Sequence, residues 1–281
     1  MGSIVQYFIK QSSKIWQLRD LRTDGWLLAD SPMTPVLLCF AYLFMVRVWG
    51  PKFMESRKSF QLQGVMIAYN AFQIVLNGWL FCEICRLTWF NGYSIICQPM
   101  DYSQNEDALR LMFMGYCLYI SKLIDFLDTL FFILRKKENQ ITFLHVFHHT
   151  ATPLSVWLGF RFIPGGHSSF YPTCNTLVHT VMYLYYMMAA MGPSVQKYLW
   201  WKKYLTVLQM VQFVMLGLHS IQLLFIDCDY PKAYSWGTAT QAVMYFILFK
   251  NYHKGAYGSR PTQMSALAKS APPSVMEKKH L

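Results

Sequence analysis

The feature that most constrains this chain is the recurrence of long apolar stretches. A membrane-spanning helix needs about 20 mostly apolar residues, and stretches near that length cover residues 33–49, 64–84, 108–134, 143–160, 168–190, 204–226 and 236–252. Only 14% of the 281 residues carry charge, whereas about 25% is usual in soluble domains. The sequence therefore predicts an all-α multi-pass membrane protein with seven transmembrane helices.

Seven spans leave little of the chain for a soluble domain. Residues 1–32 contain no long apolar core, so this segment does not look like a cleaved signal peptide. We expect three parts: an N-terminal segment over residues 1–32, a membrane domain over 33–253 and a tail over 254–281.

Lys and Arg are distributed unevenly between the two sides of the predicted membrane. The loops after the first, third and fifth spans and the tail after the seventh hold most of them. The positive-inside rule places these loops in the cytosol, with the N-terminus luminal and the C-terminus cytosolic. The net charge of +11 therefore reflects topology, and we expect no nucleic-acid partner. Four basic residues oppose this orientation: Lys10, Lys14, Arg19 and Arg22.

The end of the tail resembles a targeting signal. Lys278 and Lys279 resemble the dilysine signal that returns membrane proteins to the endoplasmic reticulum. A tail that is merely basic is the alternative.

Two of the seven cysteines, Cys97 and Cys228, lie in loops, while the other five lie in apolar spans, where small buried thiols are common. Both loops face the non-cytosolic side in this topology. That side is oxidising if the membrane is that of the endoplasmic reticulum, so we predict a disulfide between Cys97 and Cys228.

Charged groups at membrane depth are costly and usually face a bundle interior or a wet cavity. In the third span Lys122, Asp125, Asp128 and Thr129 share one helical face. Lys122 and Asp125 could simply neutralise each other. One ammonium cannot neutralise two carboxylates, so we expect another cationic partner, such as a histidine, for Asp128.

Three histidines open the fourth span. The offsets between His145, His148 and His149 place all three imidazoles on one face near the cytosolic end. Imidazole can bind a metal, act as acid and base, or attack an acyl group. Three together favour chemistry over passive packing.

Two further spans carry polar stripes at helical spacing. They contain Asn175, His179, Tyr183 and Tyr186 in the fifth span and Gln209, Gln212 and His219 in the sixth. A core histidine and interhelical hydrogen bonds are the structural alternatives. We expect the stripes of the four spans to face one shared cavity.

Basic residues lie at the cytosolic ends of these spans: Arg135, Lys136, Lys137, Lys197, Lys202 and Lys203. They could serve only to set topology. The sharper hypothesis is an electropositive mouth for a phosphate-bearing ligand whose other end enters the cavity, a shape that coenzyme A thioesters have.

Four ordered motifs then resemble one known family. His145, His148 and His149 form the HxxHH box of the ELO family of very-long-chain fatty acid elongases, which are 3-oxoacyl-CoA synthases. Residues 122–129 resemble its KxxExxDT motif, 175–183 its NxxxHxxMY motif and 206–212 its TxxQxxQ motif. Asp125 stands where the family usually has Glu, so the hydrogen bonds of that carboxylate would shift or pass through water.

The resemblance implies a fold and a reaction. Six of the seven helices would form a barrel around an acyl tunnel. The reaction joins an acyl-CoA with malonyl-CoA and gives a 3-oxoacyl-CoA two carbons longer, carbon dioxide and free CoA. No cofactor or metal is implied beyond the two CoA substrates. Later steps of the cycle need a 3-oxoacyl-CoA reductase, a dehydratase and an enoyl-CoA reductase as partners, and a homodimer is left open.

The resemblance also suggests residue roles. His148 would attack the thioester to form an acyl-imidazole, while His145 and His149 orient groups or move protons. His179 and Asn175 would donate hydrogen bonds to the thioester or enolate oxygen, and Lys122 and Asp128 would hold histidine tautomers and neutralise charge. We expect the remaining polar and basic residues to bind substrate: Asp125, Thr129, Tyr183, Tyr186, Gln209, Gln212, Arg135, Lys136, Lys137, Lys202 and Lys203.

Two other classes of protein remain as alternatives. A membrane di-iron desaturase or hydroxylase uses about eight imidazole ligands, whereas five histidines lie in the predicted spans. A seven-helix receptor or transporter fits the span count, but clustered imidazoles beside cytosolic lysines fit it poorly. Release of CoA from an acyl-CoA alone would separate the elongase from both.

Overall fold

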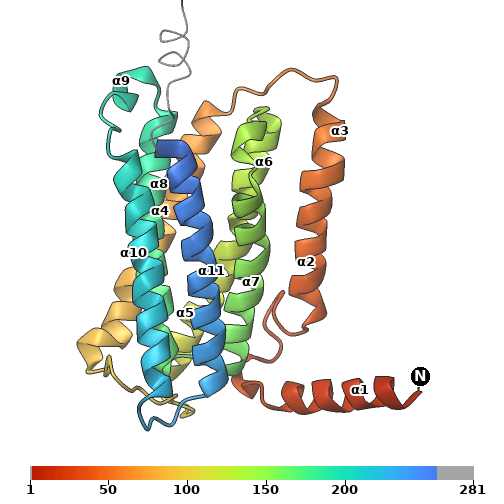
Figure 1. The fold of residues 1–281 in the computed structure, drawn as a ribbon, viewed down its shortest axis with the longest axis vertical. Coiled ribbons are helices and arrows are strands. Elements are labelled where there is room, and N and C mark those ends of the chain that lie inside the picture. The colour runs from red at the N-terminus through yellow and green to blue at the C-terminus, as the bar shows by residue number, and fades with distance from the viewer. Residues whose placement is uncertain (1, 258–281) are drawn as a thin grey trace, which may run out of the picture.

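The structure is a computed structural model that describes residues 2–257, and within them every regular element is a helix (Figure 1). The described elements are α1 (Gly2–Gln17), α2 (Met33–Phe44), α3 (Gly50–Met54), α4 (Gln63–Leu87), α5 (Glu106–Ile124), α6 (Phe126–Leu134), α7 (Phe143–Phe162), α8 (Phe170–Ala190), α9 (Pro193–Gln196), α10 (Lys202–Ile221) and α11 (Lys232–Tyr257), with short 3-10 or π turns between some of them. Lys278 and Lys279 lie outside the described residues.

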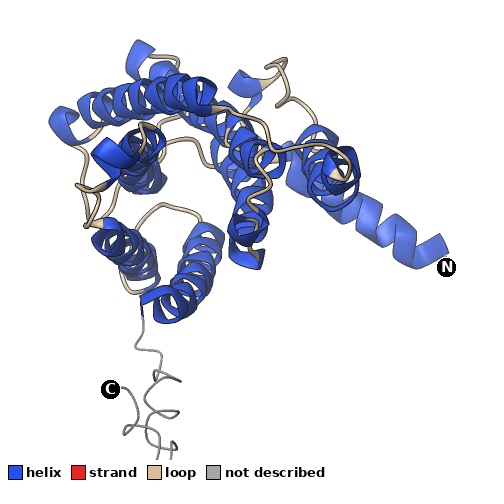
Figure 2. Cartoon of the chain, turned by 90° about the horizontal axis from the view of Figure 1, so that it is seen from above, coloured by secondary structure: helices blue, strands red, loops and turns tan. Residues whose placement is uncertain are grey.

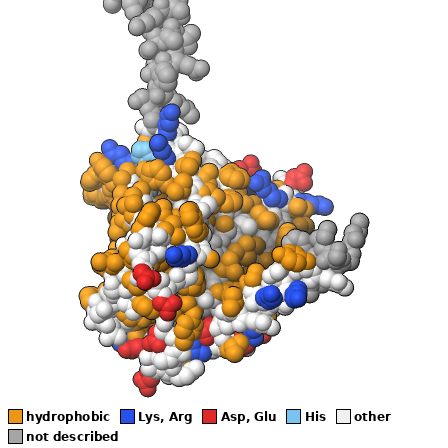
Figure 3. Space-filling view, turned by 60° about the horizontal axis from the view of Figure 1, so that its bottom comes forward, with side chains coloured by type: hydrophobic (Ala, Val, Ile, Leu, Met, Phe, Trp, Pro, Cys, Tyr) orange, Lys and Arg blue, Asp and Glu red, His pale blue; other side chains and the backbone are white. Residues whose placement is uncertain are grey.

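Three helical segments are long and apolar enough to cross a membrane: Met33–Met54, Gln63–Asn91 and Lys202–Leu224. Hydrophobic side chains cover much of the flank of the bundle, and charged ones gather toward its ends (Figure 3). The prediction of an all-α membrane protein is confirmed. The predicted span over 108–134 is divided at Asp125, where α5 ends and α6 begins.

The starts of two helices follow from their capping residues. The side chain of Asn105 accepts a hydrogen bond from the amide of Ala108 at 2.7 Å, and Glu106 and Asp107 lie in the first turn of α5. Thr142 caps α7 in the same way through the amide of His145, at 3.2 Å. This cap fixes where α7 begins, and with it the position of the first histidine.

The end of the bundle opposite the start of α7 is tied together covalently. A disulfide joins Cys97 to Cys228 with their Cα atoms 5.7 Å apart, the pair that the sequence predicts. Nearby, the amide of His167 donates to the carbonyl of Gln98 at 2.7 Å, and the ring of His219 stacks on that of His167 at 3.9 Å. His219 therefore packs at this disulfide end. Of the five thiols predicted to be buried in spans, Cys82 is exposed.

The sequence did not predict α1, which extends away from the other helices at the disulfide end (Figures 1 and 2). The chain that follows it is held by Arg161 of α7, which is fully buried. Its guanidinium donates to Thr23 and, at 2.9 Å, to Asp24. Hydrogen bonds from Arg19 and Arg161 hold the pKa of Asp24 below its ordinary value. The N-terminal segment is thus anchored to the membrane domain.

Candidate active site

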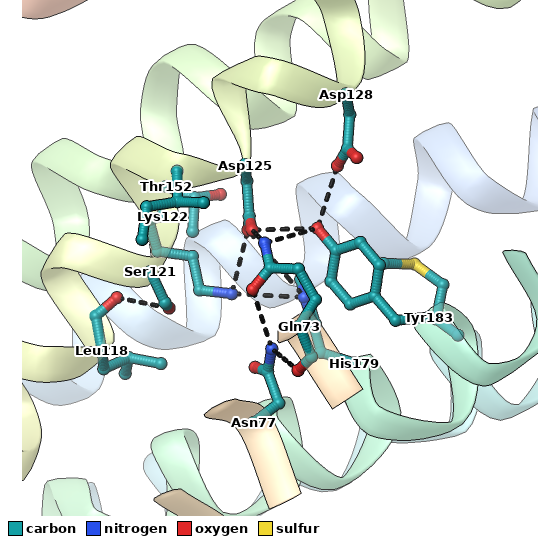
Figure 4. A network of polar contacts seen from close by, with 12 residues as sticks. Gln73, Asn77, Leu118, Ser121, Lys122, Asp125, Asp128, Thr152, His179 and Tyr183 are labelled. Atoms are coloured by element: carbon teal, nitrogen blue, oxygen red, sulfur yellow. Dashed lines mark hydrogen bonds and ion pairs between the residues drawn. The ribbon is translucent and has the colours of Figure 1, made fainter. Parts of the chain in front are cut away.

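Six polar residues from four helices meet in the interior and form what we call the carboxylate cluster: Gln73, Lys122, Asp125, Asp128, His179 and Tyr183 (Figure 4). They come from α4, α5, α6, α8 and the junction of α5 with α6. Buried polar groups are costly unless hydrogen-bonded, and each of these groups has a partner in the cluster.

Asp125 is the centre of the carboxylate cluster. Its carboxylate accepts hydrogen bonds from Gln73 at 2.7 Å and from Tyr183 at 2.9 Å, and it pairs with Lys122 at 3.2 Å. The residue is 3% exposed. The shorter carboxylate thus reaches its partners directly, and the water that a shortened side chain could require is not needed for these contacts.

Tyr183 lies between two carboxylates. Its Oη is 2.9 Å from Oδ1 of Asp125 and 2.9 Å from Oδ2 of Asp128. A phenol has one proton to donate, so two full hydrogen bonds need a second proton on a carboxyl oxygen. One shared proton would leave Lys122 and the two carboxyl groups neutral overall. The prediction of a cationic partner for Asp128 was wrong, because the phenol of Tyr183 bonds to this carboxyl group instead.

The contact between Lys122 and His179 defines a tautomer. Nζ of Lys122 lies 3.3 Å from Nδ1 of His179. An ammonium group has donors only, so Nδ1 accepts and the ring proton resides on Nε2. His179 consequently offers an N–H at its other side, which is the form that can donate to a substrate oxygen.

A second group, the histidine cluster, comprises Tyr42, Thr129, His145, His148, His149 and Tyr245. The ring centroids of His145 and His149 are 4.2 Å apart, and those of His148 and His149 are 5.5 Å apart. The predicted single face for the three imidazoles is therefore what α7 presents. Tyr245 of α11 lies 5.2 Å from His148.

His145 is held in place by Thr129. The Oγ1 atom of Thr129 is 2.7 Å from Nε2 of His145 and 2.9 Å from the hydroxyl of Tyr42. Thr129 belongs to the histidine cluster, and it directly follows Asp128 of the carboxylate cluster on α6. This short helix therefore couples the histidine cluster to the carboxylate cluster.

Other predicted site residues occupy different surroundings. Asn175 is buried, and its Oδ1 has no partner among the described residues. Tyr186 is 37% exposed, whereas Tyr183 is fully buried. Gln212 is buried, and Gln209 contacts the sulfur of Met182 at 3.5 Å.

The predicted basic residues lie at the end of the bundle where α7 begins with its three histidines, which we call the histidine end. Arg135, Lys136 and Lys137 lie between α6 and the start of α7, and Lys202 and Lys203 open α10. Within the described part of the chain, no hydrogen bond or ion pair joins these five side chains to either cluster.

Sequence reasoning missed residues that complete both clusters. Gln73 binds Asp125, and Asn77 donates to the carbonyl of Gln73 at 2.9 Å. Together with Asn70 they form a buried polar stripe on α4. The same helical spacing that marked the other spans would have found them. Tyr42 and Tyr245 carried no such signal, because each is a lone phenol in an apolar stretch.

An apolar cavity of about 1070 Å³ begins one turn along α7 from His148, at Ala151 and Ser155. It continues toward the disulfide end between α5, α7 and α11, where Leu111, Met114 and Gly237 line it. Of the described residues that line it, none is charged. The cavity can hold an alkyl chain beside the histidine cluster.

Comparison with known proteins decides the family. A model described as the GNS1/SUR4 family, ELO, matches residues 27–265. The chain belongs to the ELO family. An elongase of very long chain fatty acids from Aedes aegypti is 46% identical over 271 residues, which are 96% of this chain and 76% of that protein.

Two further ELO relatives align over most of their lengths. Very long chain fatty acid elongase 7 of Drosophila melanogaster is 48% identical over 252 residues, covering 89% of this chain and 77% of its own. Very long chain fatty acid elongase 7 of Rattus norvegicus is 43% identical over 240 residues, covering 85% of each chain. The expected family is confirmed.

Proposed function

We propose that this ELO protein is the condensing enzyme of fatty acid elongation, an acyltransferase that joins a long-chain acyl-CoA with malonyl-CoA. The observation that carries the proposal is the histidine cluster at one end of an uncharged cavity. His148 is half-buried, and among the described residues its side chain has ring neighbours but no hydrogen bond. A free ring nitrogen beside an alkyl-binding cavity suits attack on a thioester.

In the first half-reaction a ring nitrogen of His148 would attack the thioester carbonyl. A C–N bond forms and the C–S bond breaks, giving an acyl-imidazole. The departing thiolate takes the proton of the other ring nitrogen and leaves as CoA. His149 and His145 lie in ring contact with one another and beside His148, where they can orient the ring or move this proton.

In the second half-reaction malonyl-CoA would lose carbon dioxide and form an enolate. The enolate carbon attacks the acyl-imidazole, the C–N bond breaks, and the ring takes up one proton from solvent. The N–H on Nε2 of His179 can donate to the developing oxyanion, a contribution of about 3 kcal/mol for one donor. Asn175, one turn away on α8, can donate through its amide nitrogen. No cofactor enters this scheme.

The carboxylate cluster would act by positioning. Lys122 fixes the tautomer of His179, and Asp125 and Asp128 balance its charge. Because Gln73 and Tyr183 hold both carboxyl groups, the cluster can keep this arrangement while substrates exchange.

We extend the proposal to topology and surroundings. Seven spans, six of them forming a barrel around the tunnel, would cross the membrane of the endoplasmic reticulum over residues 33–253, with residues 1–32 luminal, the tail cytosolic and a dilysine signal at Lys278 and Lys279. The disulfide between Cys97 and Cys228 supports this orientation, because both loops are then luminal. Arg135, Lys136, Lys137, Lys202 and Lys203 would bind CoA phosphates at the cytosolic mouth, with Gln209, Gln212 and Tyr186 as further substrate contacts.

The product would pass to a 3-oxoacyl-CoA reductase, a dehydratase and an enoyl-CoA reductase in the same membrane. A homodimer is compatible with the proposal and is not required by it. Engineered glycosylation sites in the two ends of the chain test the orientation, because only a luminal site is modified.

Intact-mass analysis tests the mechanism directly. Purified protein incubated with a long-chain acyl-CoA alone should release CoA once and gain the acyl mass on His148. The His148→Ala variant should gain nothing, whereas His253→Ala, a histidine near the end of α11, should be acylated normally. Full condensation without any adduct would refute the acyl-histidine intermediate and leave the elongase function standing.

A further inference from the structure

The contacts between α7 and α11, both labelled in Figure 1, differ along the seam between the two helices. Toward the histidine end the two helices are joined by polar contacts. Gln241 donates to Ser155 at 2.8 Å, the hydroxyls of Tyr245 and Thr152 are 3.3 Å apart, and the ring of Tyr245 lies against His148. Within the described residues, the hydrogen bonds and ring contacts between these helices all lie in this half.

The half of the seam nearer the disulfide end is open. Gly159 of α7 and Gly237 of α11 both line the apolar cavity. A Cβ atom added to either glycine would meet no atom within 4 Å. Their neighbours Leu158 and Trp236 also line the cavity and are 52% and 62% exposed. The cavity therefore reaches the outer surface of the bundle between these two helices.

The surroundings of the opening are apolar. Ala233 and Phe162 continue the lining on the two helices, and Ile15 and Leu18, at the end of α1, contribute from the anchored N-terminal segment. Hydrophobic side chains cover much of the face of the molecule that Figure 3 shows. An exposed apolar surface of this kind on a membrane protein faces lipid hydrocarbon.

We propose that this stretch of the seam is a lateral opening through which the distal part of the acyl chain extends from the cavity into the membrane. The inference rests on the proposed function. Its occupant is an alkyl chain, because the described lining offers no charge to a phosphate or carboxylate. Substrates longer than the cavity are then accommodated by lipid.

Variants that narrow the lateral opening test the proposal. Gly237→Leu and Gly159→Leu each add a side chain to the opening, one from α11 and the other from α7. Gly255→Leu is the matched control, since it makes the same change on α11 outside the cavity lining and its Cβ also meets nothing within 4 Å. Condensation is assayed in nanodiscs with saturated acyl-CoAs from lauroyl-CoA to cerotoyl-CoA.

In the two narrowed variants the rate with the longest chains, relative to lauroyl-CoA, should fall by about tenfold, as expected when a pocket excludes a few methylenes. The Gly255→Leu variant should keep the wild-type ratio. A wild-type ratio in both narrowed variants that are folded and active would overturn the opening. Absence of condensation in the wild type would instead count against the proposed function.

A second readout does not depend on turnover. Lignoceroyl-CoA with a photoreactive diazirine at its terminal carbon is bound to the wild-type protein in nanodiscs and irradiated. Cross-links to phospholipid, or to Leu158 and Trp236, support the opening, and they should diminish in Gly237→Leu. Cross-links confined to interior residues such as Met114 would contradict it even if the variants fail to fold.

Discussion

The two polar clusters are adjacent, yet they satisfy their polar groups to different degrees. In the carboxylate cluster Lys122, Asp125 and Tyr183 are buried, and each makes at least two polar contacts. In the histidine cluster His145 is held by Thr129, whereas His148 and His149 are half-buried and have only ring neighbours among the described residues.

In the proposed mechanism this difference separates positioning from reactivity. Charged groups remain in an interior only when they are paired and hydrogen-bonded, and these contacts occupy Lys122 and Asp125, while the N–H on Nε2 of His179 is left for substrate. A neutral imidazole is less costly to leave unpaired and keeps its lone pair available. Under the proposed function, the reaction would take place at the histidine cluster, and the carboxylate cluster would support it.

The largest predicted effect is the loss of condensation rate on removing the imidazole of His148, which has no hydrogen bond among the described residues. We expect His148→Ala to lower the condensation rate at least about a thousandfold, as removal of a nucleophile does, with little change in thermal stability. Radiolabelled malonyl-CoA incorporation measures the rate, and His253→Ala serves as the control. A His148→Ala enzyme within tenfold of wild type would reverse the assignment of the two clusters.

Breaking the ion pair should act mainly on stability. Lys122→Met leaves the carboxylate of Asp125 buried without its cation, which costs about 3–5 kcal/mol in comparable pairs. Denaturant unfolding in detergent measures the loss.

The double variant Lys122→Met/Asp125→Asn removes both charges and should recover part of that free energy. If the losses of stability in Lys122→Met and Asp125→Asn simply add in the double variant, there is no coupling free energy between the two residues. The carboxylate cluster would then not act as a unit.

A smaller effect is expected from the phenol between the carboxyl groups. Tyr183→Phe removes hydrogen bonds to Asp125 and Asp128 and should lower the free energy of unfolding by about 1–3 kcal/mol. Tyr186→Phe, three residues along the same helix and partly exposed, is the control and should be nearly neutral. Equal losses in the two variants would show that the phenol of Tyr183 is not a special bridge.

The smallest effect should come from the link between the clusters. Thr129→Val keeps the side-chain shape but loses the contact with His145, and we expect a loss of about 1 kcal/mol in stability. Thr150→Val removes a hydroxyl that bonds only to the backbone of α7, and it should change stability less. A larger loss in Thr150→Val would argue against a coupling role for α6.

The sequence predicted those parts of the site that depend on spacing along one helix. The offsets of His145, His148 and His149 place their rings together because α7 is one continuous helix from its cap at Thr142. The pair between Lys122 and Asp125 follows from the same regularity. The prediction for Asp128 failed, because its partner comes from another helix and periodicity says nothing about which residue faces it.

The set of apolar helices and the face on which each carries its polar groups could be read from the sequence alone, since both follow from hydrophobicity and the helical repeat. Tertiary structure decided which faces meet. It brought Gln73 and Tyr183 to Asp125, placed Tyr245 against His148, and left α7 and α11 apart where Gly159 faces the cavity. Those outcomes depend on how whole helices pack, a collective fit of many side chains that no local pattern encodes.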